Sequence, residues 1–210
     1  MQYDYTVLMF INGLSGHFSW LDMLITNFSK YGPLIFGLYL IGLWFTGKTP
    51  EETTKNRRQA LYAFIAALLA LGINQVIGFM WFRNRPYIDQ PVHQLFPVTS
   101  DASFPSDHAS GGFSIAGSIF FERSFSGTVL FVLAALLAVS RVYAGIHYPS
   151  DILGGIVIGL VSSMIVDSTK DFIEKPITLI LSAWNLIEIK IIGNKPKIPI
   201  TDDGQKISQV

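Results

Sequence analysis

The chain has 210 residues, half of them hydrophobic, and only 14% are charged. Acidic and basic residues balance to no net charge, which argues against nucleic acid as a partner, and the absence of cysteine excludes disulfides and thiol chemistry. The long apolar runs predict an all-α, polytopic membrane protein with about five or six transmembrane helices and additional interfacial amphipathic helices. We expect one membrane-embedded domain over residues 1–193 and a polar, disordered tail over 194–210.

The N-terminal region begins with an amphipathic segment. From residue 18 to 28, hydrophobic residues recur at helical spacing opposite polar ones, which predicts a surface helix with Ser19 as its N-cap. We expect no removable signal peptide, because no charged region leads into a short apolar core. The first apolar run, residues 32–45, is too short for a hydrocarbon core of roughly 30 Å unless its helix extends before Pro33.

A polar loop is expected over residues 46–59, followed by a full-length span over 61–82. Asn74 and Gln75 lie within that span, and we favour hydrogen bonds between helices over direct substrate contact for both. The proline-rich residues 83–106 predict a loop, whose apolar content suits a position against lipid headgroups and the entry of a lipid.

Apolar runs over residues 109–121 and 125–139, and a third that begins after Pro149, complete five predicted spans. Small residues in these runs are expected to let helices pack closely: Gly111, Gly112, Gly154, Gly155 and Gly159. Residues 177–192 fit a helix on the inner membrane interface better than a sixth span, because charged residues precede them closely. The distribution of lysine and arginine places residues 46–59 inside.

Charged residues stand out at the ends of three of these runs. In the segment 140–151, His147 and Asp151 are four residues apart, so a helix that opens at Pro149 can return the carboxylate to the imidazole. The alternative for each residue alone is that Arg141 extends to the interface and Asp151 only caps a helix.

The second charged segment is 103–108, which places Ser106 and His108 at the mouth of an apolar helix, where free amides attract anions. Asp107 is interpreted as a first-turn helix carboxylate. The third is Arg83 to Pro86, directly after an apolar run. Three such clusters at three helix ends indicate a shared functional site.

These segments resemble the signature of the type 2 phosphatidic acid phosphatase superfamily, whose members remove phosphate from lipids and small molecules. The matching motifs are Arg85-Pro86, Pro105-Ser106-Asp107-His108, and Ser140-Arg141 with His147 and Asp151. Residues 11–15, 20–22 and 101–108 look most like the bacitracin-resistance type of undecaprenyl-diphosphate phosphatase. One departure is Gly78, which stands where the family usually has a lysine; Arg83 or a backbone donor is expected to replace that cation.

The resemblance implies hydrolysis of undecaprenyl diphosphate to undecaprenyl phosphate, which recycles the cell-wall carrier lipid and gives bacitracin resistance. It assigns a nucleophile that forms a phosphohistidine, an orienting carboxylate and an acid for the leaving group: His147, Asp151 and His108, respectively. The expected phosphate ligands are Arg85, Arg141 and Ser106, with Arg83 as a further candidate.

No cofactor is expected, and no cluster of acidic residues and histidines has the spacing of a metal site, so we predict metal-independent catalysis. The expected partners are a polyprenyl diphosphate lipid and the surrounding membrane lipids. The alternatives are phosphatidylglycerophosphate or phosphatidate phosphatase activity and, in a different class, a non-catalytic transporter subunit, which the lack of an internal repeat disfavours. The lysine and arginine distribution predicts an active site on the extracytoplasmic side of the cell membrane.

Overall fold

The computed structural model describes residues 2–97 and 101–192, and their secondary structure is helical. The eight helices of this part of the chain are α1 (Gln2–Asn12), α2 (Ser19–Phe45), α3 (Pro50–Met80), α4 (Pro86–Asp89), α5 (Asp107–Glu122), α6 (Ser124–Tyr143), α7 (Pro149–Ser168) and α8 (Lys170–Ile192). The tail, predicted to be disordered, lies outside the described residues.

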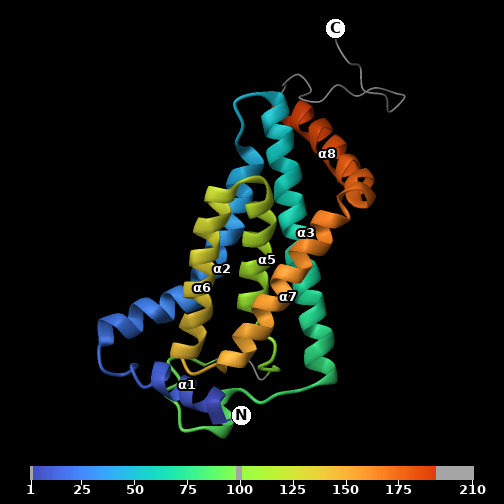
Figure 1. Ribbon diagram of the computed structural model, residues 1–210. Helices are drawn as coiled ribbons and strands as arrows, with labels where there is room; N and C mark the ends of the chain where they lie inside the picture. The colour runs from blue at the N-terminus through green and yellow to red at the C-terminus, as the bar shows by residue number, and fades with distance from the viewer. Residues whose placement is uncertain (1, 98–100, 193–210) are drawn as a thin grey trace.

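Four helices, α2, α3, α6 and α7, are long and apolar enough to cross a membrane. The fifth predicted span is α5, whose 16 residues are about 24 Å long at 1.5 Å per residue. Figure 1 shows α5 inside the bundle, where it packs on α3, α6 and α7. Large apolar side chains such as Phe79 and Phe125 are exposed, as expected for a surface in contact with lipid. The predicted all-α membrane bundle is confirmed.

Glycine allows α7 to approach the start of α5 closely. A Cβ atom at Gly155 would lie 2.7 Å from the carbonyl oxygen of Ser106, and one at Gly159 would lie 2.5 Å from that of Ser110. Gly112 also packs as predicted, since a Cβ there would meet Ala134 at 3.2 Å. The same prediction was wrong for Gly111, where an added Cβ would meet nothing within 4 Å.

The boundary between the second and third helices differs from the prediction. Residues 50–59 are not loop, because α3 already begins at Pro50. Thr49 is its N-cap and accepts a hydrogen bond from the Glu52 amide, while proline suits the first helical position. The polar residues of this first stretch form helical turns, so the connection to α2 is only residues 46–49.

The N-terminal region is also more helical than predicted. The surface helix and the first apolar run form one helix, α2, which continues through Pro33, and Phe18 rather than Ser19 is its N-cap residue. Figure 1 shows the first part of α2 running to the side of the bundle before the helix turns into it. A separate helix, α1, precedes it and was not predicted.

At the other end, α8 begins at Lys170 instead of residue 177 and includes Pro176. It is not among the helices that qualify as membrane spans within the described ranges. It packs on α3, where Ile177 and Leu181 join a buried cluster with Tyr62. This agrees with the expectation that residues 177–192 are not a sixth span.

Candidate active site

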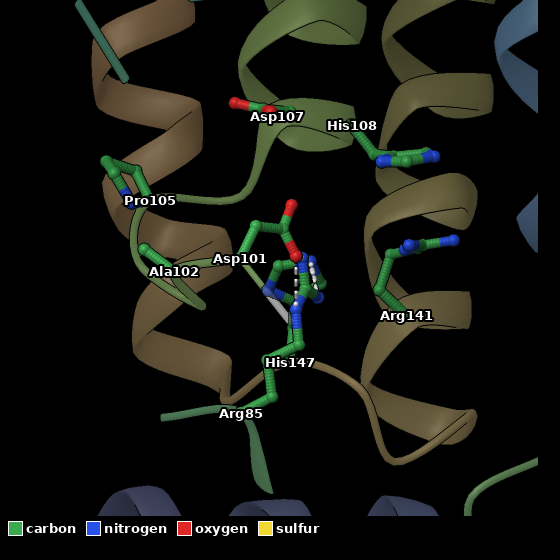
Figure 2. A pocket seen from close by; sticks show the side chains of 8 residues that line it. All are labelled: Arg85, Asp101, Ala102, Pro105, Asp107, His108, Arg141 and His147. Atoms are coloured by element: carbon green, nitrogen blue, oxygen red, sulfur yellow. Dashed lines mark hydrogen bonds and ion pairs between the residues drawn. The ribbon is translucent and has the colours of Figure 1, made fainter. Parts of the chain in front are cut away.

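The three charged segments meet around one cavity, at the end of the bundle where α6 ends and α5 and α7 begin (Figure 2). The cavity has a volume of about 250 Å³. Its ionisable lining side chains are Arg85, Asp101, Asp107, His108, Arg141 and His147. Four of the residues selected from the sequence, two arginines and two histidines, are therefore neighbours.

His147 is buried in the connection between α6 and α7, with 2% of its surface exposed. Its Nδ1 atom lies 2.9 Å from the carbonyl oxygen of Ser103, and its Nε2 atom lies 3.0 Å from Nη1 of Arg85. A carbonyl only accepts and a guanidinium only donates, so Nδ1 carries the hydrogen and Nε2 keeps its lone pair. Burial lowers the pKa of His147 to about 4, and this nitrogen is therefore unprotonated at neutral pH.

Asp151 both caps α7 and lies beside the imidazole. Pro149 is the first residue of α7, as predicted, and the Oδ2 atom of Asp151 accepts the backbone amide of Tyr148 at 2.8 Å. The same oxygen accepts the Ser103 hydroxyl at 2.5 Å and lies 3.5 Å from Nδ1 of His147. Asp151 therefore holds Ser103 in place. The carbonyl oxygen of Ser103 lies closer to Nδ1 of His147, at 2.9 Å, than the Asp151 carboxylate does, at 3.5 Å.

Arg85 lines the cavity and is held there by hydrogen bonds to a carboxylate and a backbone carbonyl. Its Nε and Nη2 atoms donate to one oxygen of Asp101 at 3.1 and 2.9 Å, and Nη1 also donates to the carbonyl of Ile146 at 3.0 Å. The arginine side chain is 7% exposed, whereas that of Asp101 is 54% exposed. Arg85 is therefore fixed, and its carboxylate partner Asp101 is exposed to solvent.

Arg141 is buried without a carboxylate partner in the described part of the chain. Its Nη1 donates to the carbonyl and hydroxyl of Ser29 at 2.9 and 3.0 Å, and its guanidinium lies 5.7 Å from the ring centre of Phe96. Its Nε atom is buried with no hydrogen-bond partner among those residues. A buried cation without a counter-charge is unfavourable, so this position favours an anionic ligand in the cavity.

His108 projects from the first turn of α5 toward α6, beside Arg141 (Figure 2). Its neighbour Asp107 is the first residue of α5, as expected for a helix-terminal carboxylate. Asn74 donates to Asp107 at 2.7 Å and to Ser110 at 2.9 Å, and Gln75 donates to Asp107 at 3.4 Å. Both amides join α3 to α5, which confirms their predicted role between helices.

Two of the expected phosphate ligands do not line the cavity. Ser106 is the fully buried N-cap residue of α5, and its hydroxyl has no partner within the described residues. Arg83 is turned away from the cavity and contacts Asp4, Ser150 and Asp151. Its guanidinium pairs with the carboxylates of Asp4 and Asp151.

The position of Gly78 nevertheless lies close to the cavity. A Cβ atom at Gly78 would approach the Cβ of Ala102 to 3.2 Å, and Ala102 lines the cavity. The segment before α5 thus packs directly on α3 where the family has its lysine. Sequence reasoning also missed Ser103 and Asp101 as individual contacts, although both belong to the segment selected by its family resemblance.

Comparison with known proteins gives the same family as the motifs. A family model described as PAP2 superfamily matches residues 59–171. Undecaprenyl-diphosphatase BcrC of Bacillus subtilis (strain 168) is 32% identical over 193 residues, which are 92% of this chain and 97% of that protein. Bacitracin transport permease protein BcrC of Bacillus licheniformis is 32% identical over 192 residues, 90% of each chain.

Among solved structures, Aquifex aeolicus LpxE is similar with a TM-score of 0.65 and 27% identity, covering 78% of this chain and 94% of that one. A PAP2-type phosphatidylglycerolphosphate phosphatase from Bacillus subtilis shares the fold, with a TM-score of 0.57, 22% identity, and coverage of 82% and 86%. The resemblance read from the three motifs is therefore confirmed, and the chain belongs to the PAP2 superfamily of phosphatases.

Proposed function

We propose that this protein hydrolyses undecaprenyl diphosphate to undecaprenyl phosphate through a phosphohistidine on His147, without a metal ion. The relatives named undecaprenyl-diphosphatase support the substrate, and the buried Arg141 beside His147 supports an anionic group in the cavity. The observation that carries the lipid part of the proposal is a second, apolar cavity that adjoins the first.

This second cavity has a volume of about 280 Å³ and is lined mainly by apolar side chains of α2, α3, α5 and α6. Asp107 and His108 line both cavities, so the polar and apolar spaces meet at the start of α5. A phosphate in the first would leave an attached hydrocarbon chain at the entrance of the second. This arrangement suits an amphipathic substrate better than a soluble phosphate ester.

The reaction begins with the bound diphosphate between Arg85 and Arg141. Phosphate oxygens are strong acceptors for guanidinium groups and compete with Nε2 of His147 for the Arg85 donor. The freed lone pair of Nε2 attacks the terminal phosphorus in line with the leaving oxygen. An N–P bond forms, the P–O bond to undecaprenyl phosphate breaks, and His108 gives its proton to the departing oxygen.

Water completes the cycle. His108, now neutral, takes a proton from water, the oxygen attacks phosphorus, and the N–P bond breaks to release inorganic phosphate and restore His147. The sum is one diphosphate and one water converted to undecaprenyl phosphate and inorganic phosphate. The proposal requires His108 to carry a proton when the diphosphate is bound, because His108 gives that proton to the leaving oxygen.

Turnover by the purified protein in detergent tests the substrate. We expect undecaprenyl diphosphate to be hydrolysed with a higher kcat/KM than phosphatidylglycerophosphate or phosphatidate. A clear preference for either of the latter would replace the proposed substrate with that lipid, and failure to release phosphate from all three would refute the enzymatic function.

Gly111 offers a direct test of the apolar cavity, because it lines the cavity and has open space where a side chain would grow. Gly111→Leu should lower kcat/KM for the long-chain substrate and leave hydrolysis of a soluble alkyl diphosphate of two to four carbons unchanged. Gly42→Leu is the matched control, since Gly42 in α2 also has nothing within 4 Å of an added Cβ. Equal losses on both substrates would contradict a chain-binding role.

We also propose that the cavity opens on the extracytoplasmic side, as the positions of lysine and arginine indicate. The connections 46–49 and 83–106 then lie on opposite sides of the membrane. Single cysteines at the exposed residues Asp89 and Lys48 test this with an impermeant thiol reagent on intact cells. Labelling of Asp89→Cys but not of Lys48→Cys is expected, and the reverse pattern would overturn the orientation.

A further inference from the structure

Arg83 links the N-terminal helix to the candidate active site. Its Nη2 atom donates to Oδ2 of Asp4 in α1 at 2.7 Å, and its Nη1 atom donates to Oδ1 of Asp151 at 2.7 Å. The guanidinium also lies over the ring of Tyr148, 3.9 Å from its centre. One planar cation is therefore held between two carboxylates from distant parts of the chain.

Asp4 also holds the first turn of α7. Its Oδ1 atom accepts the Ser150 amide at 2.8 Å, and its Oδ2 atom accepts the Ser150 hydroxyl at 2.6 Å. Burial alone would raise the pKa of Asp4, but the hydrogen bonds from Ser150 and Arg83 outweigh it and leave this pKa below its usual value. The carboxylate is thus ionised at neutral pH and complements both the arginine and the positive end of α7.

The contacts continue from Asp151 to the imidazole. One oxygen of Asp151 is fixed by Arg83, and the other receives the hydroxyl of Ser103. The Ser103 carbonyl in turn accepts the hydrogen of Nδ1 of His147. Arg83 is itself 25% exposed, so without Asp4 its side chain would have one carboxylate anchor and a path to solvent.

We propose that Asp4 is a positioning residue for the reaction: through Arg83 it fixes Asp151 and the Ser103 carbonyl, and so the direction in which His147 presents Nε2. The N-terminal helix α1 is then part of the catalytic apparatus rather than only a surface element. This inference rests on the proposed role of His147, but it makes no assumption about which lipid carries the phosphate.

The position of the attacking nitrogen affects the transition state more than substrate binding. Asp4→Ala should therefore lower kcat by roughly 10- to 100-fold with little change in KM, because a misplacement near 1 Å costs about that much. Inhibition by inorganic phosphate should be unchanged, since Arg85 and Arg141 keep their contacts. Asp4→Asn retains one acceptor oxygen and should give a smaller loss.

Asp22→Ala is the matched control. Asp22 also fixes the N-terminal region, since its carboxylate accepts the Tyr143 hydroxyl at 2.7 Å and the Gly16 amide at 3.0 Å, but none of its contacts with the described residues leads to Asp151. We expect kcat to be unchanged in this variant. An equal fall in kcat for Asp22→Ala and Asp4→Ala would show that Asp4 merely docks the N-terminal region, and would overturn the proposal.

Arg83→Ala completes the experiment. If Asp4 acts through Arg83, the double variant Asp4→Ala/Arg83→Ala should be no slower than Arg83→Ala alone. Additive losses, or normal kcat in a folded Asp4→Asn protein, would refute the relay. His147→Ala in the same series separates failure of the proposed nucleophile from failure of the positioning role. Full activity of His147→Ala would refute His147 as the nucleophile. An inactive His147→Ala together with normal kcat in Asp4→Asn would refute only the positioning role of Asp4.

Discussion

Buried arginines lie at both ends of the helix bundle, and two of them differ in their partners: among the described residues Arg57 has a carboxylate partner and Arg141 has none. Far from the cavity, Arg57 of α3 donates to Glu188 at 3.0 Å, to Asn185 at 3.4 Å and to the carbonyl of Trp44 at 3.1 Å. Its guanidinium also lies near the rings of Trp44 and Trp184. At the cavity, Arg141 has a serine and a phenylalanine ring but, in the described chain, no carboxylate.

On the proposed function, this difference separates a structural arginine, Arg57, from an arginine that binds the ligand, Arg141. Arg57 and Glu188 satisfy each other and fasten α8 to α3, so no further anion is required there. Arg141 lines a cavity of about 250 Å³ together with His147, whose Nε2 atom is unprotonated and accepts a hydrogen bond from Arg85. Arg57 and Arg141 are equally buried, and the counter-charge that Arg141 lacks among the described residues is the reason for proposing it as a phosphate ligand.

The largest expected effect is at the cavity end. His147→Ala removes the covalent route and should lower turnover by several orders of magnitude, whereas His108→Ala should cost about 10²–10⁴-fold because it removes the general acid and base but leaves the nucleophile. Steady-state release of phosphate from undecaprenyl diphosphate measures both. Retention of near-normal turnover in His147→Ala would contradict its role as nucleophile.

Exchanging each arginine for methionine tests the comparison itself. Arg57→Met removes the donor that Glu188, Asn185 and the carbonyl of Trp44 share, and should destabilise the protein by about 1–3 kcal/mol. Arg141→Met removes a buried charge that lacks a counter-charge, so it should be much less destabilising while it weakens phosphate inhibition and turnover strongly. Thermal unfolding in detergent, without ligand, measures the loss of stability in each variant. Equal destabilisation by the two substitutions would end the distinction.

The fall in kcat/KM at low pH is a smaller expected effect, and the pKa of His147 determines the pH at which it occurs. Burial holds the pKa of His147 near 4, below the usual value of 6.5, so the nucleophile becomes protonated only as the pH falls to about 4. The pH dependence of kcat/KM reports the pKa values of the free enzyme. We therefore expect no fall in kcat/KM from protonation of His147 until the pH approaches about 4. An acid limb centred near pH 6.5 and caused by His147 would contradict its buried, neutral state.

The same shift has a consequence for stability. Because the folded protein binds this proton less readily than the unfolded chain, the contribution of His147 to stability is complete above pH 6.5 and is lost as the pH falls toward 4. His147→Ala should make the unfolding midpoint less sensitive to pH in that interval.

Removal of divalent metal ions is expected to have the smallest effect. The proposed chemistry uses two arginines and two histidines, and turnover in the presence of a chelator should equal that in its absence. Loss of activity that is restored by added magnesium or zinc would contradict metal-independent catalysis.

Local patterns predicted the helical class, and the charged helix ends together with the family motifs predicted four residues that line the cavity, Arg85, His108, Arg141 and His147. Apolar runs identify helices that face lipid, and Pro149 correctly marks the start of α7, which brings Asp151 back toward His147. The boundary of α3 was missed because the polar composition of residues 50–59 outweighed a clear Thr49-Pro50 start signal.

Contacts between distant segments could not be predicted from one sequence. Arg83 resembled a phosphate ligand because it belongs to the same charged segment as Arg85, but its guanidinium contacts Asp4, Ser150 and Asp151 and does not line the cavity. Its partner Asp4 is 79 residues away in a helix that was not predicted. Likewise, Gly111 and Gly112 are adjacent in sequence and both line the apolar cavity, yet a Cβ atom at Gly111 would have open space and one at Gly112 would meet Ala134 of α6.

The most direct test of the proposed site is acid quenching of the protein during turnover of undecaprenyl diphosphate labelled in its terminal phosphate. With His108→Ala, which slows water attack on the intermediate, label should accumulate on the protein and be located on His147. With His147→Ala, the protein should carry no label. Label that persists in His147→Ala, or that is found on His108 in the wild-type protein, would contradict the assignment of the nucleophile.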